Sequence, residues 1–177
     1  MSDKILVTVD GDTAFIKVEG KGTYTVAPEL KKFCFDQISR GVCNVILDMN
    51  DCATMDSTFM GVMAGVAMRL RDLSEHTFMV INLTPKTKDL LEVLGLSNLI
   101  DCYLKEEVAD EVLDKLSDQE NFEGGDELNA VKDKAVTAKV MLKAHHDLIK
   151  ADNNKKFYEI LLLNKFELEK YIKVENR

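Results

Sequence analysis

The sequence predicts an α/β fold: a mixed β-sheet flanked by about four α-helices and followed by an α-helical hairpin. Short apolar runs alternate along the chain with longer segments in which apolar residues recur every three or four positions, as in buried strands and amphipathic helices. The first two strands are joined by Asp10-Gly11-Asp12, a sequence typical of a β-hairpin turn. An initial hairpin followed by alternating helices and strands favours a mixed sheet with helices packed on it.

The elements are expected in a regular order along the first two thirds of the chain. Apolar runs such as 45–47 are typical of strands buried on both faces, and Gly41 and Gly95 mark the ends of helices. The predicted strands are 5–9, 14–18, 45–47, 78–83 and 102–104, and the predicted helices are 27–40, 57–75, 85–94 and 105–116.

The composition changes after residue 117. Residues 118–126 form an acidic, glycine-broken linker, which separates a domain at 1–117 from a helical extension at 127–177. The extension contains two helical segments, of which the first (128–149) carries a heptad-like apolar seam. The second segment (155–173) is too apolar to lie alone in water, so we expect it to pack on its neighbour helix, the main domain or another chain.

Charge and hydropathy exclude several classes of function. The net charge of −8 argues against direct nucleic-acid binding, which depends on neutralising phosphates. No apolar run approaches the roughly 20 residues that span a bilayer, and no signal-peptide pattern is found, so we expect a cytoplasmic protein. The four cysteines form no CxxC pair and are interpreted as reduced thiols in or near the core.

The most informative stretch is 47–61, in which a buried strand leads through a loop to a serine at the start of a long helix. Ser57 could simply be an N-cap, the usual role of a serine at this place. The same place also suits a reversible phosphate, because backbone N–H groups and the positive end of the helix dipole stabilise an anion there. A phosphate would add nearly two negative charges beside Asp56 and repel a partner fitted to the unmodified surface.

Two motifs carry a family resemblance: Val45-Ile46-Leu47-Asp48, and Asp56-Ser57-Thr58-Phe59-Met60-Gly61 at the helix start. They resemble the STAS family, specifically bacterial anti-sigma factor antagonists, in which a V-L-D strand precedes D-S-[ST]-G-[LM]-G. The resemblance covers about residues 4–117 and continues in 27–30 and 90–96.

This resemblance implies a switch. The unphosphorylated domain binds a serine kinase that doubles as an anti-sigma factor, which regulates transcription indirectly. The kinase phosphorylates the serine that corresponds to Ser57, and a metal-dependent serine phosphatase reverses the reaction. The implied partner-binding surface contains Asp56, Thr58, Phe59 and Thr23. Phe59 replaces a glycine of the family and is either an exposed partner anchor or turned inward.

Two other classes of function stay open. The domain could be a scaffold that is not phosphorylated, whose helical tail drives oligomerisation, such as a homodimer, or partner binding. It could also be an enzyme or ligand-binding domain that uses the same helix N-terminus for a nucleotide or anion. Ser57 has no histidine base in a recognisable motif, and His145-His146 has no second ligand pair nearby. We therefore predict no catalytic residue, no metal site and no cofactor. Gly61 and Gly65 are expected to allow close packing of their helix on the sheet.

Overall fold

The computed structural model describes residues 2–117, 122 and 125–152. Within these residues one mixed sheet has seven strands, in the order β6-β5-β3-β2-β1-β7, with β4 paired to β2 off this path. The strands are β1 (Lys4–Asp10), β2 (Thr13–Gly22), β3 (Asn44–Asp48), β4 (Cys52–Met55), β5 (Thr77–Leu83), β6 (Asp101–Leu104) and β7 (Asp126–Asn129). The helices are α1 (Ala27–Ser39), α2 (Ser57–Arg71), α3 (Pro85–Val93), α4 (Asp110–Ser117) and α6 (Lys134–Asp152), with short 3-10 turns η1 (Leu96–Asn98) and η2 (Lys105–Glu107).

The sheet is mixed, as the sequence predicted. β1 and β2 form an antiparallel hairpin, and β1 also pairs antiparallel with β7. The pairs β2–β3, β3–β5 and β5–β6 are all parallel, which is the arrangement expected when helices connect successive strands.

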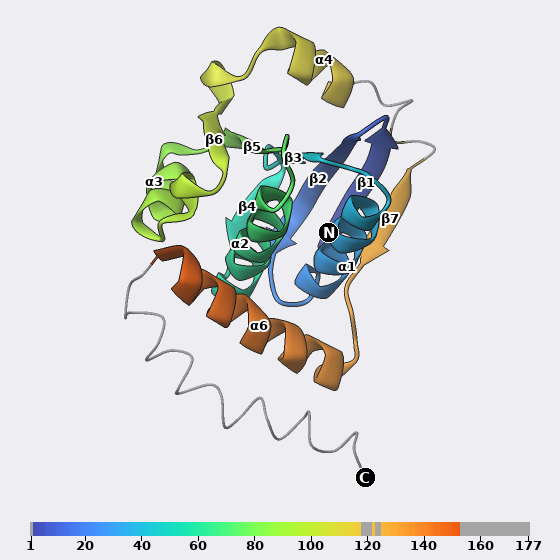
Figure 1. Cartoon of the computed structure of the whole chain (residues 1–177), viewed down its shortest axis with the longest axis vertical. Coiled ribbons are helices and arrows are strands. Elements are labelled where there is room, and N and C mark those ends of the chain that lie inside the picture. The colour runs from blue at the N-terminus through green and yellow to red at the C-terminus, as the bar shows by residue number, and fades with distance from the viewer. Residues whose placement is uncertain (1, 118–121, 123–124, 153–177) are drawn as a thin grey trace.

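The two faces of the sheet are covered unequally. α1 and α2 lie on one face (Figure 1), where Ile16, Leu47 and Val80 belong to the main core. Strand residues of opposite phase, such as Phe15 and Ile46, form a smaller cluster with Leu116 of α4, which belongs to the other face. The site described below lies on the side of α1 and α2.

Two strands were not expected. β4 was predicted as part of a loop, and it pairs in parallel with the end of β2, where the register shifts between Gly20 and Lys21. β7 was predicted as linker and helix start, and it lies beside β1 with Leu128 opposite Ile5. Both strands have four residues, and such short strands depend on a neighbouring strand more than on their own composition.

The first helix of the C-terminal extension begins later than predicted. Its first helix, α6, starts at Lys134 rather than near Leu128, and the Val131 N–H donates to the carbonyl oxygen of Thr25 at 2.8 Å. Asp133 caps this helix, because its Oδ1 accepts the N–H groups of Ala135 and Val136. The second predicted helix, 155–173, lies outside the described residues. No helix in the described part of the chain is long and apolar enough to cross a membrane.

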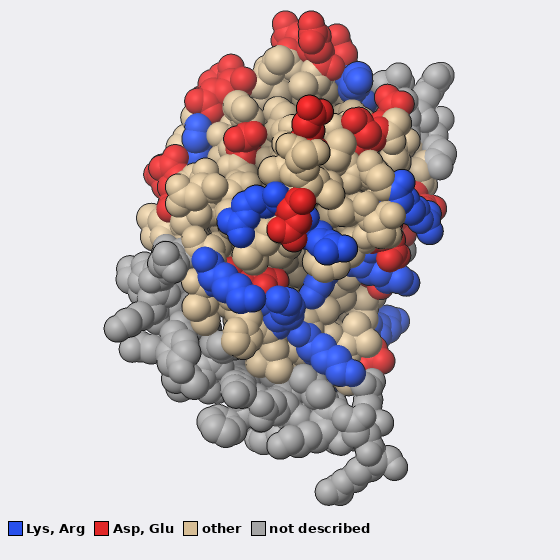
Figure 2. Space-filling model, in the orientation of Figure 1, with Lys and Arg blue, Asp and Glu red and all other residues tan. Residues whose placement is uncertain are grey.

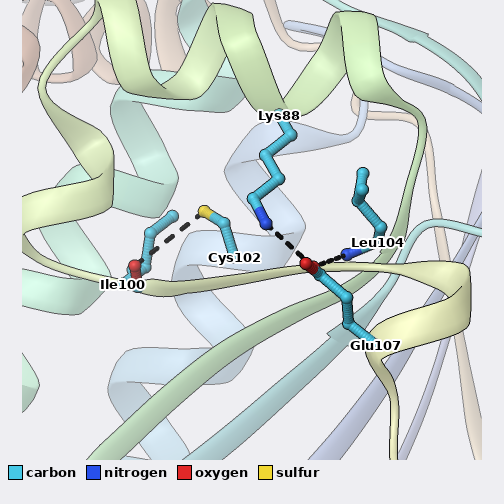
Figure 3. A network of polar contacts seen from close by, with 5 residues as sticks. All are labelled: Lys88, Ile100, Cys102, Leu104 and Glu107. Atoms are coloured by element: carbon cyan, nitrogen blue, oxygen red, sulfur yellow. Dashed lines mark hydrogen bonds and ion pairs between the residues drawn. The ribbon is translucent and has the colours of Figure 1, made fainter.

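A polar network ties α3 to the β6 edge (Figure 3). Lys88 Nζ lies 2.8 Å from Glu107 Oε2, and the same oxygen accepts the Leu104 N–H at 2.7 Å. Burial raises the pKa of the Cys102 thiol to about 11, so this cysteine stays protonated at neutral pH. The four cysteines are all free, and Cys34 is fully buried.

Candidate functional site at the N-terminus of α2

The turn after β3 is fixed by a buried carboxylate. Asp48 Oδ1 accepts the Asn50 N–H at 2.9 Å and the Asn82 Nδ2 amide at 2.7 Å. Asn82 sits in the left-handed region at φ 59°, a conformation that asparagine tolerates better than most residues. The start of the loop leading to α2 is therefore bonded to the end of β5.

Asp56, not Ser57, caps α2. Its Oδ1 accepts the Phe59 N–H and its Oδ2 accepts the Tyr24 N–H, both at 2.8 Å. The Asp56 N–H in turn donates to Gly22, so the cap joins the start of α2 to the connection between β2 and α1. Ser57 is the first residue of the helix, and its hydroxyl is not needed for capping.

The Ser57 hydroxyl instead meets a histidine that lies 88 positions away in the sequence. Ser57 Oγ and His145 Nε2 of α6 lie 3.1 Å apart. His145 is 2% exposed, and its Nδ1 has no hydrogen-bond partner among the described residues. Burial lowers the pKa of His145, and the nearby carboxylate of Asp56 raises it by a smaller amount, so the ring is neutral at pH 7.

Two glycines explain how α6 comes so close. Ser57, Gly61 and Gly65 are spaced by four residues and therefore share one face of α2. A Cβ at Gly61 would collide with the carbonyl of Ala144, and a Cβ at Gly65 would lie 2.6 Å from a carboxylate oxygen of Asp147.

The expectation that these glycines admit the sheet was therefore wrong, because the element that they admit is α6. We call Ser57, Gly61 and Gly65 the small-residue stripe. α6 runs past the lower end of α2 in Figure 1, and the contacts at Ser57, Gly61 and Gly65 place it against the stripe.

The residues predicted for the partner surface divide into two groups. Phe59 is fully buried against Gly22, so the inward alternative is observed, and Thr58 is 2% exposed. Thr23 is half-buried, and its hydroxyl lies 2.8 Å from that of Thr25. In this structure Thr58 and Phe59 are thus not available on the surface, whereas Thr23, Asp56 and Ser57 are half-buried. Neighbouring Tyr24, which sequence reasoning did not single out, is 47% exposed.

The charge around the site differs from that of the whole chain. Lys and Arg gather on the face that α1, α2 and α6 share, and Asp and Glu gather toward α3 and α4 (Figure 2). Lys143 of α6 forms a 2.8 Å ion pair with the buried Asp147. Burial lowers the pKa of Lys31 on α1, although Asp147 acts in the opposite direction. The helical face is therefore more basic than the net charge of −8 suggests.

The site offers little for metal binding or nucleophilic catalysis. No cluster of three or more His, Cys, Asp or Glu residues in the described ranges could hold a metal ion. The Ser57–His145 pair resembles a nucleophile with its base, but no described carboxylate bonds His145 Nδ1 to orient the ring.

The fold and the site define a class of domain in which a mixed sheet presents a serine at the first position of a helix. The family model of the STAS domain matches residues 4–109, and the chain belongs to this family. β7 and α6 lie beyond the matched residues.

Solved structures agree with this fold at low sequence identity. An anti-sigma factor antagonist from Mycobacterium paratuberculosis is 20% identical with a TM-score of 0.53 and covers 66% of this chain and 96% of its own. A protein from Thermotoga maritima, assigned as an anti-sigma factor antagonist, is 18% identical with a TM-score of 0.52, covering 62% and 91%. The anti-sigma factor antagonist SpoIIAA in its unphosphorylated form is 15% identical with a TM-score of 0.51, covering 64% and 98%. No curated protein matches the sequence.

Proposed function

We propose that this chain is a phosphorylation-switched protein-interaction module. In its unphosphorylated form it binds an anti-sigma factor that is also a serine kinase, and it thereby regulates transcription indirectly in the cytoplasm. A metal-dependent serine phosphatase is the expected second partner. Membership of the STAS family and likeness to anti-sigma factor antagonists support a role in partner switching.

One observation carries the proposal: the Ser57 hydroxyl stands at the first position of α2 while Asp56 performs the capping. The hydroxyl can therefore be modified without removing the helix cap. Phosphoryl transfer forms the bond between Oγ and the γ-phosphorus of ATP, breaks the bond to the ADP oxygen and releases the hydroxyl proton. The N-terminus of α2 then stabilises the phosphate through its dipole.

The modification changes the charge of the partner surface. A phosphoserine carries about −1.5 to −2 charges and would stand directly beside the Asp56 carboxylate. Asp56 cannot easily turn away, because both of its oxygens accept backbone N–H groups. A partner site that fits the neutral hydroxyl is therefore repelled after phosphorylation.

The test is to incubate the full chain with ATP and each serine kinase encoded beside its gene, and then to record intact mass. We expect a gain of one phosphate on Ser57, which Ser57→Ala abolishes. Ser39→Ala, at an exposed serine on α1, is the matched control and should label normally. Absence of phosphate with every such kinase, or phosphate on another residue, contradicts the proposal.

A second candidate is a scaffold that is not phosphorylated and whose helical tail makes an oligomer or binds a partner. The packing of α6 against Ser57 favours it, because a covered serine is a poor kinase substrate. Light scattering of the full chain over a range of concentrations tests oligomerisation. A monomer at every concentration contradicts the oligomeric form of this candidate.

A further inference from the structure

We propose that α6 is an intramolecular competitor of partner proteins and occupies the small-residue stripe. A kinase or partner protein contacts Ser57 only after α6 has left α2. The part of this inference that concerns the kinase rests on the proposed function. The part that concerns the covering of Ser57 stands on geometry alone. The stripe is thus a surface for a helix, and its occupant in this structure belongs to the same chain.

The contacts follow the whole length of the stripe. His145 meets Ser57, Ala144 meets Gly61, and Asp147 meets Gly65. An external helix cannot lie against Gly61 while α6 is docked, because backbone and Cβ atoms of Ala144 already fill the space in front of this glycine. A partner helix and α6 therefore cannot occupy the stripe at the same time.

α6 covers the atom that would be phosphorylated, Ser57 Oγ. His145 Nε2 lies 3.1 Å from Ser57 Oγ, within the space that a phosphoryl group on that oxygen needs. A phosphorylated Ser57 consequently displaces the His145 ring and, with it, the docked α6. Because coupling is reciprocal, docking of α6 and the phosphorylated state of Ser57 disfavour each other at equilibrium. Transfer of phosphate is hindered for a separate reason, since a kinase reaches Ser57 Oγ only when the His145 ring has moved away.

The connections of α6 suit a releasable helix. β7 pairs with β1, and the Val131–Thr25 hydrogen bond fixes the chain immediately before α6. Asp133 caps α6 through bonds within its own first turn. The helix can thus leave α2 while β7 stays in the sheet and the helical cap stays formed.

The docked face of α6 also contains groups that burial disfavours. His145 Nδ1 is buried without a partner among the described residues. The carboxylate of Asp147 is buried beside Gly65, and its ion pair with Lys143 is made within α6 itself. A permanent core interface avoids unpaired polar atoms. These groups gain solvent when α6 departs, which favours a two-state element over a fixed one.

The first experiment measures the covering without any kinase. In the full chain, Ser57→Cys provides a thiol whose maleimide labelling is followed by peptide mass spectrometry, which separates it from the four native cysteines. Ala144→Glu places a charge in the α2–α6 contact, and His146→Glu places the same charge on the exposed neighbouring position. We expect labelling of residue 57 to rise about tenfold or more with Ala144→Glu and to stay at the parent rate with His146→Glu. Equal rates in all three proteins overturn the proposal.

Leu148→Glu provides a second opening variant, since Leu148 is fully buried on α6. Hydrogen exchange of the sheet checks that the domain stays folded. If both opening variants unfold the sheet, α6 is a core element and the proposal is wrong. If the sheet stays protected and labelling rises, the competitor role is supported.

The second experiment adds the kinase to chains that keep Ser57. Faster phosphorylation of Ala144→Glu than of His146→Glu, by about the same factor as the labelling, supports competition with the kinase. Equal phosphorylation rates overturn that part of the inference. If no kinase modifies any variant while labelling still rises, the proposed function fails and the covering of Ser57 stands.

Discussion

The two faces of α2 make different kinds of interface. On the core side, Phe59, Met63 and Leu70 are fully buried, and such large side chains interlock with their neighbours. On the other side, the small-residue stripe meets α6, whose buried residues are mostly small or polar: Ala135, Ala138, Ala144, His145, Asp147 and Leu148. One helix thus combines an interface of large apolar side chains with one of mostly small or polar side chains, and the second interface contains the serine.

Magnitudes support this contrast. Burial of Leu148 contributes about 1.5–3 kcal/mol to docking. The unpaired Nδ1 of His145 costs about 1–3 kcal/mol, so the two effects roughly cancel. Docking of α6 then depends on the alanine contacts, on Val140 and Ile149, which are partly buried against the main core, and on the short tether to β7.

The largest effect on stability is expected from a substitution on the core side of α2. Phe59→Ala should lower the free energy of unfolding by about 3–5 kcal/mol, because it leaves a cavity against β2. Urea denaturation followed by circular dichroism measures this loss. Tyr24→Ala, at a neighbouring exposed ring, is the control and should change stability by no more than about 0.5 kcal/mol. A loss below about 1 kcal/mol for Phe59→Ala would show that this ring is not part of the core.

The second-largest effect is expected from a substitution that disturbs the α2–α6 interface and leaves the core side of α2 intact. Gly61→Ala should weaken α6 docking by about 1–3 kcal/mol, because the added methyl group meets backbone atoms of Ala144 that cannot move aside alone. Hydrogen exchange should show faster exchange in 134–152 while the sheet stays protected. Gly65→Ala is the graded comparison, since the Asp147 carboxylate that it meets can rotate. Equal effects of both substitutions would contradict the close approach at Gly61.

A smaller effect concerns the helix cap. Asp56→Ala should destabilise the protein by about 1 kcal/mol, because the Phe59 and Tyr24 N–H groups lose their acceptor. Thermal unfolding measures the change. Asp56→Asn keeps an acceptor oxygen and should retain more of the stability than alanine does. The interpretation of Asp56 as the cap fails if both variants melt with the parent protein.

The smallest effect is the pH dependence of α6 docking. Burial lowers the pKa of docked His145, and Asp56 from α2 opposes this shift. As the pH falls below the ordinary histidine pKa of about 6.5, released His145 binds a proton that docked His145 does not bind, so docking weakens. Hydrogen exchange of 134–152, corrected for the intrinsic rate, should therefore show more opening at low pH than at neutral pH. His145→Gln should remove this dependence, and a dependence that persists in the variant assigns it to another group.

Much of the fold could be predicted from local patterns. The hairpin at Asp10-Gly11-Asp12, the apolar strand β3 and the helix start at Asp56-Ser57 each carry a local signal, and the mixed sheet was confirmed. β4 and β7 carry no such signal, because they are strands only through pairing with β2 and β1.

Only the part of the candidate site that α2 contributes could be predicted from the sequence. Asp56 and Ser57 were found from their own motif, but His145 reaches Ser57 only through the docking of α6. The glycines that admit α6 were noticed, yet their spacing alone could not show which element approaches them. Phe59 showed the same difficulty, since a bulky residue in this motif fits either a surface anchor or the core.

The pairing of β7 with β1 also has a consequence for synthesis on the ribosome. β1 lies near the start of the chain, whereas its neighbour β7 begins at Asp126, so the hairpin is made long before its outer strand. Until then β1 is an open edge, which can pair with a strand of another nascent chain. Arrival of β7 covers the edge of β1, and α6 follows directly after β7, so β1 is paired on both sides before Ser57 is covered.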